Sequence, residues 1–515
     1  MNRFCAALFG LLLVYCPVQV GWGVPTYNKV VVVIEENHSF QQILGSANAP
    51  YLNQLANEGV SFTNFYAITH PSQPNYLQFF SGSNQGVLDD DLVSSSVRPF
   101  TTPNLGAELR AAGRTFGGFS QGLPSVGYNG FESGNYVRRH NPWSNWQNDA
   151  ANPGANALPS SVNMPFTSFP TTPAGYANLP TVSIVVPDVQ NDMHDGSVQA
   201  ADTWLQANLN GYYQWAKTNN SLLIVTWDED NFNSANGNRI PTIFAGAGLR
   251  TGQNNITFTH HNLLHTLEDM YGAGHAGGSS NVGSIFNVFA GEPLISTTAR
   301  TFREGANGYI GTVDTQIGAN APATNNGSAA LITVDGDIST TNSGQPSQGL
   351  IRFDNIIGTG PGQVPAGAHI VSATLRVNND ARSDTVVRLH SMLSNWDESS
   401  TWNSLNAGIS TNGVEASADT EFGIEPGSSQ TSVVFVVSES LQRWANGAPN
   451  YGWVLLPTGT DGWTFNSSEA PSITDRPILE VVYALPVPEP SSIALALSAA
   501  GLVGGILIRK RLSRT

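Results

Sequence analysis

The first half of the chain alternates continuous apolar runs with segments of helical spacing. Val30–Ile34 is an unbroken β-branched run, which predicts a strand buried on both faces of a parallel sheet. The expected strands cover residues 30–34, 181–186 and 222–227. The expected helices, where apolar residues recur every three or four positions, cover residues 49–59, 196–209 and 261–271. This alternation predicts an α/β sandwich around a mostly parallel sheet from Tyr27 to about Leu294.

The pattern changes after about Ser296. Residues 313–483 are rich in Gly, Ser, Thr and Asn and carry short runs of alternating apolar and polar positions. The clearest runs are residues 370–377, 385–389, 431–437, 452–456 and 478–482. Short strands separated by turn residues predict an all-β antiparallel sandwich as a second domain.

Both ends of the chain carry an apolar segment. The run from Phe4 to Val20 follows a basic residue and predicts a secretory signal peptide over residues 1–23. The run from Ile493 to Ile508 is followed by three basic residues, as in a short membrane segment with a cytoplasmic stop. The two cysteines, Cys5 and Cys16, fall inside the predicted signal peptide, so the exported chain is expected to contain no disulfides.

The net charge of the chain limits the classes of partner that it can bind. The formal net charge is −16 with only 22 Lys and Arg residues in 515, which argues against nucleic-acid binding. A phosphate substrate is still compatible with this acidity if bound metal ions supply local positive charge.

Hard metal ligands follow the first predicted strand. Glu36 and Asn37 offer a carboxylate and an amide oxygen, which suit a divalent cation. They stand at the carboxyl end of a parallel strand, where α/β proteins bind ligands. The alternative is that they only cap the following helix.

A candidate nucleophile comes next. Ser72 lies between Pro71 and Pro74, which restrict the backbone around its hydroxyl. No G-x-S-x-G elbow surrounds it, so activation by a metal is favoured over a hydrolase triad. Taken alone, the segment is also compatible with an ordinary turn.

Acidic groups follow two further strands. Residues 187–196 contain three aspartates and His194, which is a candidate phosphate contact or proton donor. Asp228 and Glu229 follow the strand at 222–227. Taken alone, Asp192 and Asp195 are typical turn and helix-capping residues, and the acidic segment at Asp228 is compatible with a solvated loop. Parallel strands, however, bring such ends to one edge of a sheet, which predicts a single site.

These motifs together resemble the bacterial phosphoesterase family of acid phosphatases and phospholipases C, within the alkaline-phosphatase superfamily. They are Glu36-Asn37, the segment from Pro71 to Tyr76, His194-Asp195-Gly196 and Trp227-Asp228-Glu229, in the family order. The resemblance implies an alkaline-phosphatase-like fold and a phosphoserine intermediate at Ser72. It implies metal ligation by Glu36, Asn37, Ser72, Asp228 and Glu229, substrate contacts from His194 and Asn75, and a buttressing role for His261.

The function that we predict is an exported, metal-dependent phosphomonoesterase. The ligand set leaves the metal open among Ca, Mg, Mn, Zn and Fe. A phospholipase C is the first alternative. A non-catalytic surface protein that adheres to cells or polysaccharide is the second.

Two further resemblances concern the second half. Residues 351–353, 372–376 and 396–403 resemble DNRLRE-type sandwich domains, which implies an accessory module; Trp396 and Trp402 are expected in its core. Pro488-Glu489-Pro490, the apolar run and the basic end resemble a PEP-CTERM signal, which implies exosortase processing and a Gram-negative cell surface; a plain anchor is the alternative. The predicted organisation is a signal peptide at 1–23, catalytic domain at 25–296, linker at 297–312, sandwich at 313–485 and sorting segment at 486–515.

Overall fold

The structure is a computed structural model that describes residues 24–231, 238–337, 345–381, 387–423 and 432–485. The predicted signal peptide and sorting segment lie outside the described residues. Among the residues described, no helix has both the length and the apolar character needed to cross a bilayer.

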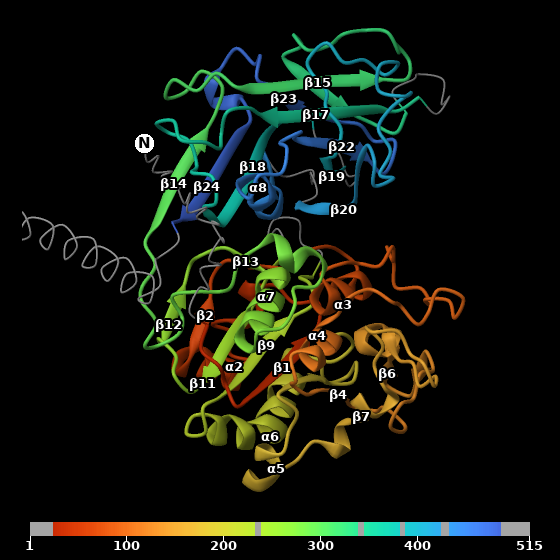
Figure 1. Ribbon diagram of the computed structural model, residues 1–515, viewed down its shortest axis with the longest axis vertical. Coiled ribbons are helices and arrows are strands. Elements are labelled where there is room, and N and C mark those ends of the chain that lie inside the picture. Colours follow the sequence, from red (N-terminus) through yellow and green to blue (C-terminus); the bar gives the residue numbers. More distant parts are fainter. Residues whose placement is uncertain (1–23, 232–237, 338–344, 382–386, 424–431, 486–515) are drawn as a thin grey trace, which may run out of the picture. The chain divides into compact units, whose positions relative to one another are not determined.

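An eight-stranded, mostly parallel sheet forms the centre of the first half (Figure 1). Its order is β12-β2-β11-β9-β1-β8-β4-β7. β1 pairs in parallel with β8 and β9, β8 pairs in parallel with β4, and β11 runs antiparallel to β9. The strands are β1 (Lys29–Glu35), β2 (Val60–Phe62), β4 (Phe116–Ser120), β7 (Asn163–Pro165), β8 (Val182–Val186), β9 (Ser221–Trp227), β11 (Thr242–Gly246) and β12 (Gly252–Asn254). The β-branched run in β1 is buried throughout, as expected for a strand covered on both faces.

Two groups of helices cover this sheet. α2 packs on α6, and α3 and α4 pack on α7. The helices are α1 (Phe40–Ile43), α2 (Pro50–Glu58), α3 (Ser72–Ser81), α4 (Leu105–Ala111), α5 (Pro173–Ala177), α6 (Val198–Ala216) and α7 (His260–Tyr271). Minor strands are β3 (Phe65–Tyr66), β5 (Glu132–Ser133), β6 (Tyr136–Val137), β10 (Arg239–Ile240) and β13 (Phe258–Thr259).

Helix α6 is longer than the sequence pattern predicts. The expected helix ends at Leu209, before Gly211, but α6 continues to Ala216. A Cβ atom at Gly211 would lie 2.6 Å from the hydroxyl of Tyr176. This glycine therefore allows a close side-chain approach inside the helix and does not mark its end.

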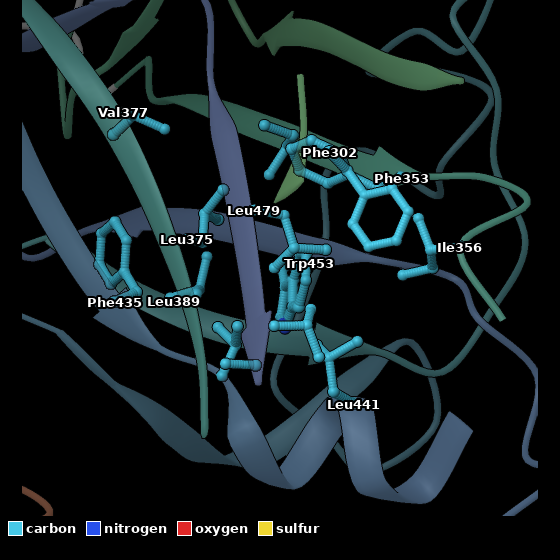
Figure 2. Close-up of a cluster of buried hydrophobic side chains, with 14 of the residues drawn as sticks. Phe302, Phe353, Ile356, Leu375, Val377, Leu389, Phe435, Leu441, Trp453 and Leu479 are labelled. Atoms are coloured by element: carbon cyan, nitrogen blue, oxygen red, sulfur yellow. The ribbon is translucent and has the colours of Figure 1, made fainter. Parts of the chain in front are cut away.

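The second half is an antiparallel β-structure, in which every strand pair within residues 297–484 that the structure describes runs antiparallel. Its strands are β14 (Thr297–Phe302), β15 (Thr312–Gly318), β16 (Leu331–Val334), β17 (Ser347–Phe353), β18 (His369–Ala381), β19 (Val387–Met392), β20 (Ala416–Gly423), β21 (Ser432–Val436), β22 (Trp453–Pro457), β23 (Trp463–Asn466) and β24 (Ile478–Ala484). Figure 2 shows one apolar cluster of this half, where Leu441 of α8 (Ser438–Ala445) joins Trp453 and Leu479. A second apolar cluster contains Ile317, Leu350 and Trp396.

The boundary between the two halves differs from the prediction. Residues 297–312 were expected to form a linker, but 297–302 form β14, which pairs with β24 along its full length. Most of β14 is exposed, and Phe302 is its one buried side chain. The strand therefore lacks the apolar alternation that would reveal it in the sequence.

The predicted fold class is confirmed: a mostly parallel α/β domain precedes an all-β antiparallel domain. Trp396 is buried and donates its indole N–H to the Tyr451 carbonyl, 2.7 Å away. Trp402 packs partly buried against the same apolar cluster. Both tryptophans therefore belong to the core, as expected.

Candidate active site

The carboxyl ends of adjacent strands bring the predicted site residues together. Glu35, the last residue of β1, is in register with Trp227, the last residue of β9. The Asp228 N–H donates to the Glu35 carbonyl at 3.0 Å, and the Glu36 N–H donates to the Asp192 carbonyl at 2.7 Å. The segments after β1, β8 and β9 therefore meet at one edge of the sheet, as the sequence predicts.

Ser72 reaches this edge from the first turn of α3. Pro71 is the N-cap of the helix, and Ser72 is its first residue. The Ser72 hydroxyl lies 3.2 Å from Glu36 Oε2 and 3.4 Å from Glu229 Oε1. The positive end of the α3 dipole faces this region, which favours an anionic group beside the hydroxyl.

Four buried carboxyl groups surround this position: Glu36, Asp192, Asp228 and Glu229. Burial raises the pKa of Glu36 well above its usual value, and the charges of Asp228 and Asp192 raise it further. The pKa of Asp228 is raised by burial and then by Glu229. Such a concentration of buried acid is costly unless protons or a cation compensate it.

The donor atoms fit a divalent cation. Asn37 Oδ1 and Asp228 Oδ2 are buried and accept no hydrogen bond from the residues that the structure describes. Asn37 has a left-handed backbone (φ 54°), and its N–H groups donate to Asp228 Oδ1 and Glu36 Oε2 at 3.1 and 3.2 Å. The N–H groups of Asn37 are thus engaged, while its side-chain oxygen Oδ1 has no donor among the described residues. Carboxylate and amide oxygens are the ligands that hard cations prefer.

Two aromatic rings support Glu36 from the other side. The Tyr76 hydroxyl donates to Glu36 Oε1 at 2.7 Å. The His140 ring stacks on the Tyr76 ring, with centroids 5.2 Å apart, and its Nδ1 lies 3.2 Å from Glu36 Oε1 and 3.3 Å from Asp192 Oδ2. Burial lowers the pKa of His140 well below its usual value, with smaller contributions from the charges of Arg139 and His194.

Sequence reasoning did not find His140 as a site residue. It lies in a short 3-10 turn, Arg138–His140, and not at the end of a predicted strand. Neither apolar periodicity nor a strand-end motif marks this segment.

His194 stands at a more exposed position. Its ring Nδ1 lies 2.8 Å from Asp195 Oδ1, and its backbone N–H donates to Asp192 Oδ1. Its side chain is 28% exposed. A nitrogen of its ring, a nitrogen of His140 and an oxygen of Glu36 all lie within 4.8 Å of one another. His194 can therefore face both the carboxyl cluster and an incoming ligand.

Two predicted residues have structural partners instead of open positions. Asn75 is buried; its Oδ1 accepts from the N–H groups of Ile68 and Thr69, and its amide donates to Glu229 Oε2 at 3.1 Å. We interpret it as a positioning residue for Glu229. His261 lies 2.9 Å from Gln78 Oε1 on α3, in agreement with a buttressing role.

A sorting motif is found at the end of the chain. Residues 486–511 match the PEP-CTERM protein-sorting motif. This motif is a signal for export, and it implies processing by an exosortase. The resemblance of residues 313–485 to DNRLRE-type domains stays a prediction.

The catalytic half matches known phosphatases. Residues 46–274 match the phosphoesterase family model. The chain is 44% identical over 265 residues to a phosphatidylinositol-3-phosphatase of Mycobacterium tuberculosis, covering 52% of this chain and 84% of that protein. It is 28% identical to an acid phosphatase of Aspergillus fumigatus, covering 50% of this chain and only 58% of that protein. A solved alkaline-phosphatase-superfamily protein from Vibrio parahaemolyticus matches at 12% identity and TM-score 0.36, over 50% of this chain and 69% of that chain, too low for a functional inference. The extent of the first of these matches shows that the chain belongs to the phosphoesterase family and is a phosphoric-ester hydrolase.

Proposed function

We propose that the chain is a metal-dependent phosphomonoesterase whose nucleophile is Ser72. The observation that carries the proposal is the position of the Ser72 hydroxyl, between Glu36 and Glu229 in a cluster of buried carboxyl groups. Two of the predicted ligand atoms, Asn37 Oδ1 and Asp228 Oδ2, are buried and have no donor among the described residues. A serine hydroxyl is a weak nucleophile at neutral pH until a base or a coordinated cation activates it, and this cluster offers ligand atoms for a cation.

The residues that would hold the cation are Glu36, Asn37, Ser72, Asp228 and Glu229. When bound, a divalent cation lowers the pKa of a coordinated hydroxyl and offsets charge on a phosphate group. His70 Nδ1 and the Asn75 amide both contact Glu229 Oε2, at 2.9 and 3.1 Å, and so fix the orientation of that carboxylate. The ligand set is therefore held in place by the protein before any metal binds.

The reaction proceeds in two displacements at phosphorus. Ser72 Oγ attacks the phosphate group, the bond from phosphorus to the ester oxygen breaks, and a phosphoserine forms. Glu36 Oε2, 3.2 Å from the hydroxyl, is the nearest acceptor for the serine proton. His194 stands at the rim and donates a proton to the departing alcohol oxygen. Water then attacks the phosphoserine and gives a proton to His194, the bond from phosphorus to Ser72 Oγ breaks, and Ser72 takes its proton back from Glu36 as phosphate leaves.

A monoester substrate is favoured over a diester. Both curated relatives described above are named as phosphatases, the class that hydrolyses phosphate monoesters. One of them is named for a phosphoinositide, so the alcohol part of the substrate stays open between lipid and small molecule. A phospholipase C is the second candidate. We further propose that the mature protein acts outside the cell, because the sorting motif is an export signal.

The experiment compares two chromogenic esters with the purified full-length protein. Hydrolysis of p-nitrophenyl phosphate and of p-nitrophenyl phosphocholine is measured with and without chelator, for wild type and for Ser72→Ala. We expect the monoester to be cleaved, and we expect the cleavage to disappear with chelator and in the variant.

Other outcomes assign the function elsewhere. Selective cleavage of the phosphocholine ester would make the protein a phospholipase C. Activity that survives in Ser72→Ala would exclude the serine mechanism. Inactivity on both esters across pH and added metals would contradict the proposed phosphomonoesterase.

A further inference from the structure

A second group of metal-type ligands lies on α7, outside the Ser72 cluster. His265 and Asp269 are one helical turn apart, and His275 follows in the loop after the helix. One side-chain ligand atom from each of the three lies within 4.8 Å of the others. None of these residues contributes to the proposed hydrolysis mechanism.

The contacts converge on one carboxylate. His265 Nε2 lies 3.2 Å from Asp269 Oδ2, and His275 Nε2 lies 2.9 Å from Asp269 Oδ1. The two imidazole rings stack with centroids 3.9 Å apart and an interplanar angle of 20°. Ligand atoms around a tetrahedral zinc ion lie about 3.3 Å apart, because zinc bonds to nitrogen and oxygen are about 2.0–2.1 Å long. The observed separations to Asp269 are close to this value.

The hydrogen bonds behind the ligands are those of a metal site. His265 Nδ1 lies 2.7 Å from the Ser279 carbonyl, which can only accept, so Nδ1 carries the hydrogen. The other ring nitrogen, Nε2, faces Asp269 Oδ2 at 3.2 Å and is the atom available to bind an ion. Ser284 Oγ donates to Asp269 Oδ2 at 2.5 Å and orients the carboxylate. Histidines that bind metal usually hydrogen-bond to a carbonyl through their other ring nitrogen, and carboxylates that bind metal usually accept a hydrogen bond as well.

The exposure of the three side chains also favours a bound cation. His265 is largely buried, with its side chain 10% exposed, while Asp269 and His275 are 26% and 27% exposed. The group therefore has an ordered inner ligand and a side open to solvent through which an ion can enter.

We propose that His265, Asp269 and His275 bind a divalent transition-metal ion of the zinc class, separate from the cation beside Ser72. Two imidazole nitrogens and one carboxylate suit zinc or cobalt, whereas the oxygen-only set beside Ser72 suits harder ions. The ion would fasten the loop that carries His275 to the end of α7.

The test titrates the metal-free full-length protein with Co²⁺ and records the visible d–d absorption. We expect a band that is lost in His275→Ala and His265→Gln and kept in Asp380→Asn, a control at an exposed carboxylate on β18. In parallel, bound Zn²⁺ is measured by mass spectrometry after dialysis. Wild type and control should hold one equivalent more than either histidine variant.

Two controls keep the result interpretable. Circular dichroism establishes that each variant is folded, and the two histidine variants must agree. The Asp228→Asn variant, altered in the Ser72 cluster, should retain the cobalt band, which separates the two sites. Equal zinc content in wild type and both folded histidine variants would overturn the proposal.

Discussion

At the residue scale, the chemistry depends on which acceptor atoms lack a donor. Glu36 is fully buried and receives hydrogen bonds from Ser72 and Tyr76. Among the described residues, no donor reaches Asn37 Oδ1 or Asp228 Oδ2, and both residues are predicted to bind metal. Asp192 Oδ2 and the Glu35 carboxylate also lack a donor there, although neither residue was predicted to bind metal.

Tyr76→Phe tests this support of Glu36. Loss of the 2.7 Å hydrogen bond leaves a ligand oxygen without its donor and should weaken metal affinity about 10–100-fold. The measurement is the metal concentration required for half-maximal hydrolysis of p-nitrophenyl phosphate. Tyr51→Phe is the matched control, because the buried Tyr51 hydroxyl has no hydrogen-bond partner among the described residues. Equal metal requirements for both variants would show that Tyr76 does not position Glu36.

The sequence was informative at this scale only where a residue follows a predicted strand. Glu36 and Asp228 could be placed at one edge because parallel strands β1 and β9 end together. His140 could not be placed at this edge from the sequence, because it reaches Glu36 through tertiary packing of its ring on Tyr76. The sequence around His140 contains no pattern that predicts this contact.

At the element scale, the loop after β8 must be shaped to present His194. A Cβ atom at Gly196 would lie 1.9 Å from the Gln190 carbonyl oxygen, which is backbone and cannot rotate away. The loop is therefore closed on itself at Gly196, two residues after His194.

Gly196→Ala should open this loop. We expect a loss of about 1–3 kcal/mol of stability, as for other overpacked sites, and a fall in kcat as His194 moves. Chemical denaturation and steady-state kinetics measure the two effects. Gly154→Ala is the control, since a Cβ atom there meets nothing within 4 Å, and it should stay within about 0.5 kcal/mol of wild type. Similar behaviour of the two variants would contradict the proposed constraint.

The start of α7 contributes a pH dependence to stability. His260 is fully buried with Nε2 2.8 Å from the Trp227 carbonyl, and burial lowers its pKa from 6.5 to about 4. Below pH 6.5, His260 becomes protonated in the unfolded chain, whereas in the folded chain it stays neutral down to about pH 4. The free energy of unfolding should therefore fall with decreasing pH across this window, by about 3 kcal/mol from this residue.

His260→Gln separates this contribution from those of other groups. The glutamine amide can still donate to the Trp227 carbonyl but does not titrate. Denaturation at a series of pH values from 4 to 7 should show a shallower slope for the variant. Identical slopes for variant and wild type would mean that His260 is not the group responsible.

Prediction of the elements succeeded where burial dominates the pattern. The apolar runs of β1, β8 and β9 stand out because both faces of these strands are covered. Strand β14 is not predicted from the sequence because it is mostly exposed. The predicted end of α6 comes too early in the chain because Gly211 is typical of a helix end. In both cases, contacts with distant segments override the local signal.

At the scale of the whole molecule, acidic residues outnumber basic ones, so we expect a bound cation to stabilise the folded state. The chain has 38 Asp and Glu residues against 22 Lys and Arg residues. A cation that binds only the folded state stabilises it by about 2.7 kcal/mol at 100 times its dissociation constant.

Chelation should therefore lower the melting temperature of the full-length protein by a few degrees, and added metal should restore it. Differential scanning calorimetry with and without EDTA measures the shift. Asp228→Ala, which lacks one ligand of the Ser72 site, should show a smaller shift than wild type. A melting temperature unaffected by chelator would exclude a metal that contributes to stability.

The central claim is that Ser72 carries the phosphate during turnover. The most direct measurement is to quench the full-length protein with acid during hydrolysis of a phosphate monoester and to locate bound phosphate by peptide mass spectrometry. We predict phosphate on Ser72 in the wild type and none in a folded, inactive Ser72→Ala variant. Phosphate on a different residue, or turnover by Ser72→Ala, would contradict the account.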